Sequence, residues 1–79
     1  MQADIVYDAG PTGCGELVMH LFLTMRRMEV GQMIEVVSYD IGARVDIPAW
    51  CTLRAQHLVE TRDVEGTRHY FIRRTGAAL

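Results

Sequence analysis

Hydrophobic and polar positions along the chain change period, and each period predicts a different element. Ile5-Val6-Tyr7 is a β-branched and aromatic run that ends at a loop with glycine and proline, so it predicts a strand. From Glu16 onward, apolar residues recur at the spacing of a helix that lies on a core, until Gly31 ends the pattern. The residues on this stripe are Leu17, Val18, Leu21, Phe22, Met25 and Met28.

The second half of the chain predicts a strand, a helix and a hairpin. Residues 33–39 are apolar on both faces of a strand, which is typical of a central position in a sheet. A second helical stripe follows at Ala43, Ile47, Trp50 and Leu53. Pro48 lies within it, so the helix is expected either to kink there or to start its regular part near Ile47. Residues 57–62 and 67–73 are strand-like runs joined by a turn with glycine, which predicts a closing β-hairpin.

The element order is therefore βαβαββ, and it predicts an α+β fold. We expect a two-layer α/β sandwich in which two helices pack on one face of a four-stranded mixed sheet. The initial strand, helix and strand predict a right-handed crossover and a parallel pair. A chain of 79 residues can bury one core, so residues 1–79 should form a single domain, with a frayed tail at 75–79.

Composition and charge narrow the classes of protein. Eight Lys and Arg residues against ten Asp and Glu residues leave a formal charge of −2, which argues against a protein that neutralises many nucleic-acid phosphates. The apolar runs are too short to span a bilayer, and the first residues lack the basic start of a signal peptide. We expect a cytoplasmic protein with no membrane association. Its two cysteines are too few for a disulfide-stapled secreted fold.

Cys14 has the best case for chemistry, because it lies where the first strand passes to the first helix. Free N–H groups and the macrodipole at a helix N-terminus stabilise a thiolate. The flanking Gly13 and Gly15 leave room for a partner to approach, whereas the charge of Glu16 opposes a thiolate. The alternative is that Cys14 is an inert, small hydrophobic residue.

The second cysteine, Cys51, borders the second apolar stripe and is expected to be buried. Each cysteine is followed six residues later by a histidine. Six residues rotate a helical side chain by about 600°, so the two side chains lie roughly 120° apart and do not share a face. We therefore predict no metal site and no cofactor.

Two surface features are candidates for binding. Met19 and Leu23 fall outside the first stripe and form a candidate contact patch for a partner protein, although isolated exposed apolar residues are also ordinary. Residues 68–74 interleave basic and aromatic side chains, as strands that bind RNA do. Tyr70 and Ile72 in this run also alternate as core positions would, which favours a structural role.

Several segments in a specific order resemble one protein family. They are Tyr7-Asp8 with Gly10, Gly13 and Cys14, then Val30-Gly31-Gln32, Asp40, Asp46-Ile47-Pro48-Ala49-Trp50-Cys51-Thr52-Leu53, and Tyr70-Phe71-Ile72-Arg73-Arg74. Together they resemble the TusA/SirA-like sulfur carriers, small cytoplasmic proteins of βαβαββ fold. The family motif is Cys-Pro-x-Pro, whereas this chain has Cys14-Gly15-Glu16-Leu17 and neither proline, so the motif is degenerate.

The resemblance implies that Cys14 is the acceptor cysteine and carries sulfane sulfur as a persulfide. It also implies a protein donor, such as a cysteine desulfurase or a rhodanese-like protein, and a protein acceptor. Gly13, Gly15 and Glu16 would then form the supporting loop and helix start. The alternative is a non-catalytic domain of the same fold that binds a protein, or as the weaker case RNA, through the open sheet face or the Met19 and Leu23 patch.

Overall fold

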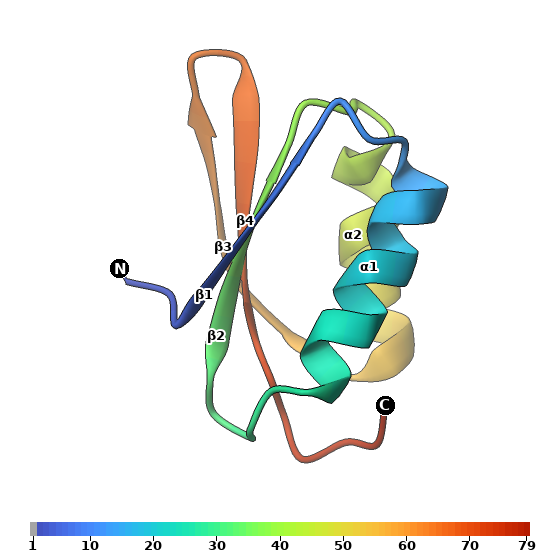
Figure 1. Ribbon diagram of the computed structural model, residues 1–79, viewed down its shortest axis with the longest axis vertical. Coiled ribbons are helices and arrows are strands. Elements are labelled where there is room, and N and C mark those ends of the chain that lie inside the picture. The colour runs from blue at the N-terminus through green and yellow to red at the C-terminus, as the bar shows by residue number, and fades with distance from the viewer. Residues whose placement is uncertain (1) are drawn as a thin grey trace.

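The chain folds into a four-stranded sheet with two helices packed on one of its faces (Figure 1). This computed structural model describes residues 2–79. The elements in chain order are β1 (Ile5–Gly10), α1 (Cys14–Arg26), β2 (Met33–Ser38), α2 (Ala43–Arg54), β3 (His57–Val64) and β4 (Thr67–Arg73). The predicted α+β sandwich of order βαβαββ is therefore confirmed.

The sheet has the strand order β1-β2-β4-β3, which places β2 in the interior as its apolar pattern predicted. β1 and β2 are parallel, with Ile5 opposite Ile34, whereas β4 is antiparallel to both of its neighbours. The turn between β3 and β4 has only two residues, Glu65 and Gly66, both with positive φ (51° and 83°). Positive φ at both positions is the signature of the type I′ turn that closes twisted hairpins.

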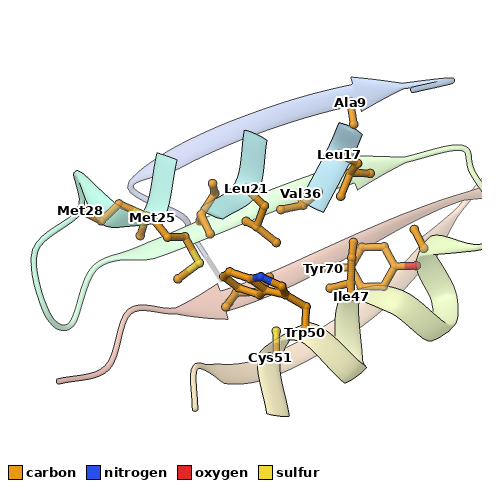
Figure 2. Packing of buried hydrophobic residues seen from close by; sticks show 13 residues of the cluster. Ala9, Leu17, Leu21, Met25, Met28, Val36, Ile47, Trp50, Cys51 and Tyr70 are labelled. Carbon is orange, nitrogen blue, oxygen red and sulfur yellow. The ribbon is translucent and has the colours of Figure 1, made fainter. Parts of the chain in front are cut away.

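The core lies between the sheet and the helices (Figure 2). Fully buried side chains come from both layers: Leu17, Leu21, Met25, Ile34, Val36, Ile47, Tyr70 and Ile72. Cys51 is 2% exposed, so its predicted burial is confirmed. The alternation of Tyr70 and Ile72 is likewise that of core positions.

Helix α2 begins at Ala43 and contains Pro48, so of the two predicted alternatives the regular start near Ile47 is wrong. One residue of the predicted stripe also lies elsewhere. Leu53, expected on the buried stripe, is 78% exposed. Successive steps of three residues drift round a helix by about 60° each, so Leu53 lies roughly 120° from Ile47 and turns outward.

The face of the sheet opposite the helices is covered by charged side chains. Phe71 is only 3% exposed there, with the Arg62 guanidinium 5.3 Å from the centre of its ring. His69 Nδ1 lies 2.5 Å from Glu35 Oε2 on the neighbouring strand. In the part of the chain that the structure describes, neither helix has the length and apolar content of a membrane span.

The C-terminal tail makes contacts with the body of the protein. The Gln56 side-chain oxygen accepts a 2.8 Å hydrogen bond from the Thr75 N–H, and the Arg74 guanidinium donates to the Ala77 carbonyl. Leu79 packs against the core. Fraying of residues 75–79 stays a prediction.

Candidate functional site

Cys14 is the first residue of α1, as its position between a strand and an amphipathic stripe predicted. Gly13 caps the helix in an extended conformation (φ −65°, ψ 153°), and its carbonyl accepts the Leu17 N–H at 2.9 Å. The apolar pattern starts at Glu16, and the helix begins two residues earlier, at Cys14. Cys14 itself is partly buried, so its sulfur is sheltered without being sealed from solvent.

Two carboxylates from the second half of the chain share this site with Cys14. Because β1 and β2 are parallel, their carboxyl ends lie at the same end of the sheet. The loop after β2 therefore lies beside the start of α1. A Cβ placed on Gly42 would lie 3.3 Å from Cys14 Sγ and 3.1 Å from Asp40 Oδ2. Asp46, in the first turn of α2, lies against Cys14 in the same groove.

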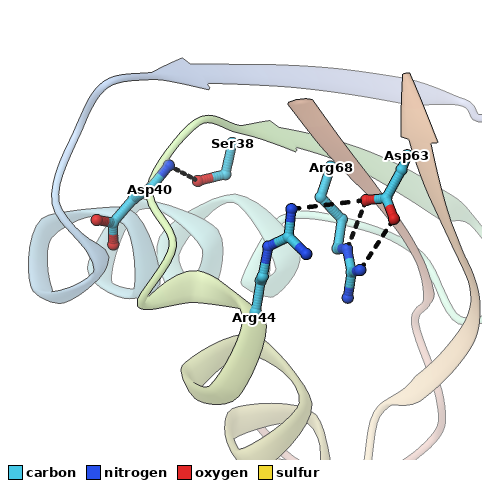
Figure 3. Close-up of polar contacts among 5 residues, drawn as sticks. All are labelled: Ser38, Asp40, Arg44, Asp63 and Arg68. Atoms are coloured by element: carbon cyan, nitrogen blue, oxygen red, sulfur yellow. Dashed lines mark hydrogen bonds and ion pairs between the residues drawn. The ribbon is translucent and has the colours of Figure 1, made fainter. Parts of the chain in front are cut away.

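Polar contacts hold the loop that carries Asp40 and the start of α2, which carries Asp46 (Figure 3). The Asp40 N–H donates to the buried Ser38 hydroxyl oxygen at 3.1 Å. The Arg44 guanidinium, in the first turn of α2, lies 3.9 Å from Asp63 Oδ1. The same oxygen pairs with Arg68 Nε at 2.8 Å. The start of α2 is thereby tied to the β3–β4 hairpin, and Figure 3 shows the Asp40 carboxylate pointing away from this cluster.

The electrostatics of the site favour the protonated thiol. The pKa of Cys14 is raised above its ordinary value of 9.0, first by the Asp46 carboxylate, which is placed to accept the thiol hydrogen, then by burial, and then by Asp40. The two carboxylates thus oppose the stabilisation that a helix N-terminus gives a thiolate. Glu16 is not a cause of the shift: it lies 3.7 Å from His20 on the flank of α1.

An apolar groove leads away from Cys14 between α1 and α2. Its first part, of about 300 Å³, is lined by Cys14, Gly15, Val18, Asp46, Ala49, Trp50 and Leu53. The second part, of about 340 Å³, shares Gly15, Val18, Trp50 and Leu53 and adds Met19, Phe22 and Arg54. The exposed Leu53 is thus a wall of this groove, which extends along both helices.

The two residues of the predicted contact patch lie one helical turn apart on α1 and line different hollows. Met19 and Leu23 are both exposed on α1, as expected. Met19 lines the groove that begins at Cys14, whereas Leu23 lines a different hollow, between α1 and β1. Within residues 2–79, no three His, Cys, Asp or Glu side chains are grouped so that they could hold a metal ion.

Comparison with known proteins shows which family the chain belongs to. The model of a family described as sulfurtransferase TusA matches residues 5–74. The chain belongs to the TusA family. It is 35% identical to the sulfur carrier protein TusA of Pseudomonas paraeruginosa over 90% of both chains. It is 32% identical to the sulfur carrier protein TusA of Pseudomonas putida over 90% of this chain and 89% of the relative.

Sequence reasoning located Cys14 in this TusA-family chain but assigned no role to Asp40 and Asp46. The signal for them was available, because Asp40 directly follows the second strand and Asp46 falls within the first turn of the next helix. The parallel pairing that brings strand ends together was itself predicted. What was missing was the step from that pairing to the side chains it gathers around Cys14.

Gly15 offers a test of how the helix start behaves without the family's prolines. Gly15→Ala should raise the free energy of unfolding by up to about 1 kcal/mol, because alanine favours a helix and a Cβ there meets nothing within 4 Å. Urea denaturation followed by circular dichroism measures this. The matched control is Gly42→Ala, whose Cβ crowds Cys14 Sγ and should give no such gain. Equal effects of the two substitutions would contradict the prediction.

Proposed function

We propose that this protein is a cytoplasmic sulfur carrier that accepts sulfane sulfur as a persulfide on Cys14 and passes it to a partner protein. The observation that carries the proposal is the position of Cys14, the first residue of α1, partly buried at the head of the groove. Membership of the TusA family supports the role of sulfur carrier. A donor and an acceptor protein each have to bring a sulfur atom to this one position.

The transfer consists of two exchanges between sulfur atoms. The Cys14 sulfur attacks the outer sulfur of the donor's persulfide, so that a new S–S bond forms on Cys14 as the donor's S–S bond breaks. Cys14 gives up its proton as its sulfur attacks, and the donor's cysteine leaves as a thiolate that takes up a proton. The acceptor's thiolate then attacks the outer sulfur on Cys14 in the same way. No external oxidant or reductant is required.

The charges around Cys14 favour passing sulfur on over storing it. The outer sulfur of a persulfide is anionic, and the free N–H groups at the start of α1 stabilise it. Asp40 and Asp46 act in the opposite sense, since they already disfavour a negative charge on the Cys14 sulfur. The loaded state is thereby kept from becoming so stable that the acceptor cannot unload it.

The groove provides the surface on which partner proteins approach the sulfur. Its apolar walls include Val18 on α1 and Leu53 on α2, and Cys14 lies at one end. Burial of such side chains by a partner is favourable and excludes water from the reacting sulfurs. Under this proposal, the exposed Leu53 side chain is part of the apolar surface that a partner protein buries.

Sulfur loading tests the proposal directly. The reduced protein is incubated with a persulfidated rhodanese-like protein, and its intact mass is measured. We expect a gain of one sulfur atom, removed again by dithiothreitol. The gain should persist in Cys51→Ala and vanish in Cys14→Ser. Both variants should remain folded. The role is refuted if the wild-type protein takes up sulfur neither from this donor nor from a cysteine desulfurase supplied with cysteine.

Two observations favour a second function, that of a non-catalytic protein-binding domain of the same fold. The pKa of Cys14 is raised, which disfavours the reactive thiolate, and both prolines of the family motif are absent. In that case Cys14→Ser would leave cellular function unchanged, whereas Leu53→Asp, which places a charge in the groove wall, would abolish it. A defect with Cys14→Ser and none with Leu53→Asp would reject this second function.

A further inference from the structure

The apolar groove between α1 and α2 has opposite charges at its two ends. The helices run side by side in the same direction, so both first turns lie at the Cys14 end and both last turns at the far end (Figure 1). Asp46 lines the groove at the Cys14 end, where Asp40 shares the site. Arg54, in the last turn of α2, lines the groove at the far end. A segment that lies along the groove therefore meets negative charge at one end and positive charge at the other.

Two guanidinium groups converge on one aromatic ring at the far end of the groove. Arg54 Cζ lies 4.9 Å from the centre of the Phe22 ring, and Arg26 Cζ lies 5.4 Å from the same point. Cation–π attraction holds both groups at the ring, although their like charges repel each other. Among residues 2–79, no carboxylate, Glu29 in the next loop included, lies within ion-pair distance of either arginine. An incoming carboxylate relieves the repulsion and accepts hydrogen bonds from the guanidinium groups.

The remaining charged side chains of the two helices do not face the groove. Glu16 lies about 100° round α1 from Gly15, which is part of the groove wall. His20 and Arg27 line a different hollow, beside β1. Arg44 is tied to the β3–β4 hairpin by its ion pair. The acidic end and the basic end of the groove are thus not offset by opposite charges on the helices that form it.

The dimensions of the groove suit an extended segment. Arg54 follows Asp46 by eight residues of α2, which corresponds to about 12 Å at 1.5 Å per residue. An extended chain covers this distance in about four residues, at ~3.3 Å each. The two parts of the groove, about 300 and 340 Å³, accommodate side chains of such a segment, whereas a whole helix is about 10 Å across.

We propose that the groove binds an extended segment of the sulfur donor protein, with a basic residue beside its reactive cysteine and an acidic residue about four residues away. The basic residue pairs with Asp46, and the acidic residue enters between Arg26 and Arg54. Apolar side chains between them lie against Leu53. This inference rests on the proposed carrier function, because the segment's cysteine has to reach Cys14. The two opposite charges fix the direction of the segment and so place its cysteine at the correct end.

The donor fits this charge pattern better than the acceptor does. Cys14 acts as the nucleophile only in the exchange with the donor. A cation that pairs with Asp46 offsets the largest cause of the raised Cys14 pKa, so docking favours the thiolate at the step that needs it. In the exchange with the acceptor, Cys14 carries the sulfur that is attacked and needs no such help.

Peptides with an activated cysteine test the charge pattern. Each contains, in order, a lysine, the cysteine as a mixed disulfide with thionitrobenzoate, three apolar residues and a glutamate or a lysine. When the Cys14 thiolate attacks the peptide sulfur, an S–S bond forms between them and coloured thionitrobenzoate leaves. Absorbance gives the rate, and intact mass identifies the adduct. The glutamate peptide should react several-fold faster than the lysine peptide, and salt should reduce the difference.

Charge reversal tests the far end of the groove. Arg54→Glu should reverse the preference, so that the lysine peptide reacts faster. Arg27→Glu is the matched control, because it makes the same change of charge outside the groove and should retain the preference. Equal rates of the two peptides with the wild-type protein, or equal loss of preference in both variants, would overturn the assignment. So would a dimer that shields Cys14 as the protein concentration rises, since a second copy would then occupy the groove.

Sulfur loading of the wild-type protein separates this inference from the carrier function. Uptake of sulfur without any preference between the peptides refutes the inference and leaves the carrier function standing. A preference for the glutamate peptide without uptake of sulfur supports the recognition of charge and refutes the carrier function.

Discussion

Asp46→Asn is expected to make Cys14 react several-fold faster with iodoacetamide at neutral pH. The thiolate is the reactive species, and the Asp46 carboxylate is the largest cause of the raised Cys14 pKa. Removing its charge lowers that pKa. A larger fraction of the thiol is then ionised at pH values below the ordinary cysteine pKa of 9.0. The rate is measured from pH 6 to pH 10 by intact mass, and the midpoint of the profile should move to lower pH.

Asp63→Asn is the matched control for this substitution. Asp63 is also a carboxylate, but its pKa is lowered by Arg68, with which it pairs, and it is not among the causes of the Cys14 shift. Its removal should leave the alkylation profile of Cys14 in place. A profile that moves equally in the two variants, or that does not move in Asp46→Asn, would show that Asp46 does not set the thiol's protonation.

Leu21→Ala is expected to lower the free energy of unfolding by about 2–5 kcal/mol. Leu21 is fully buried in the middle of α1, where its removal leaves a cavity that the packed layers cannot close (Figure 2). A loss of this size is a large part of the roughly 5–15 kcal/mol that stabilises a typical domain. Urea denaturation followed by the fluorescence of Trp50, itself 7% exposed, measures the change.

The neighbouring Leu23→Ala isolates the contribution of burial. Leu23 has the same side chain on the same helix but is 48% exposed, so its truncation should change the free energy of unfolding by no more than about 0.5 kcal/mol. Helix propensity changes equally in both variants and cancels in the comparison. Equal destabilisation by the two substitutions would mean that the buried stripe of α1 is not what holds the layers together.

Most of the fold follows from local periodicity, because each element here buries one face or one stripe. The change of period at Glu16 located α1, and the apolar run of β2 indicated an interior strand. Helix α2 was harder to predict, since Pro48 argues locally against a helix that tertiary packing of Ala43, Ile47 and Trp50 nevertheless stabilises. The outward turn of Leu53 results from angular drift that a spacing of three residues conceals.

The position of Cys14 in the fold was predictable, but the charges around it were not. The junction of strand and helix identified Cys14, and the helix dipole suggested a thiolate. Asp40 and Asp46 are distant from Cys14 in the sequence. The parallel pairing of β1 and β2 brings them to the same end of the sheet as Cys14. Their effect on a thiol depends on separations of a few ångströms, which a pattern of residue types does not contain.

The protonated state of Cys14 also bears on how the protein withstands oxidants. Peroxide attacks thiolates, and repeated attack converts a cysteine through sulfenic acid to sulfinic and sulfonic acids, which thiols do not reduce. Under the proposed carrier function, Cys14 has to remain accessible to partner proteins and is therefore exposed to this damage. Because Asp46 and Asp40 raise the pKa of Cys14 and so favour its protonated form, they would slow the first oxidation step while the sulfur stays accessible.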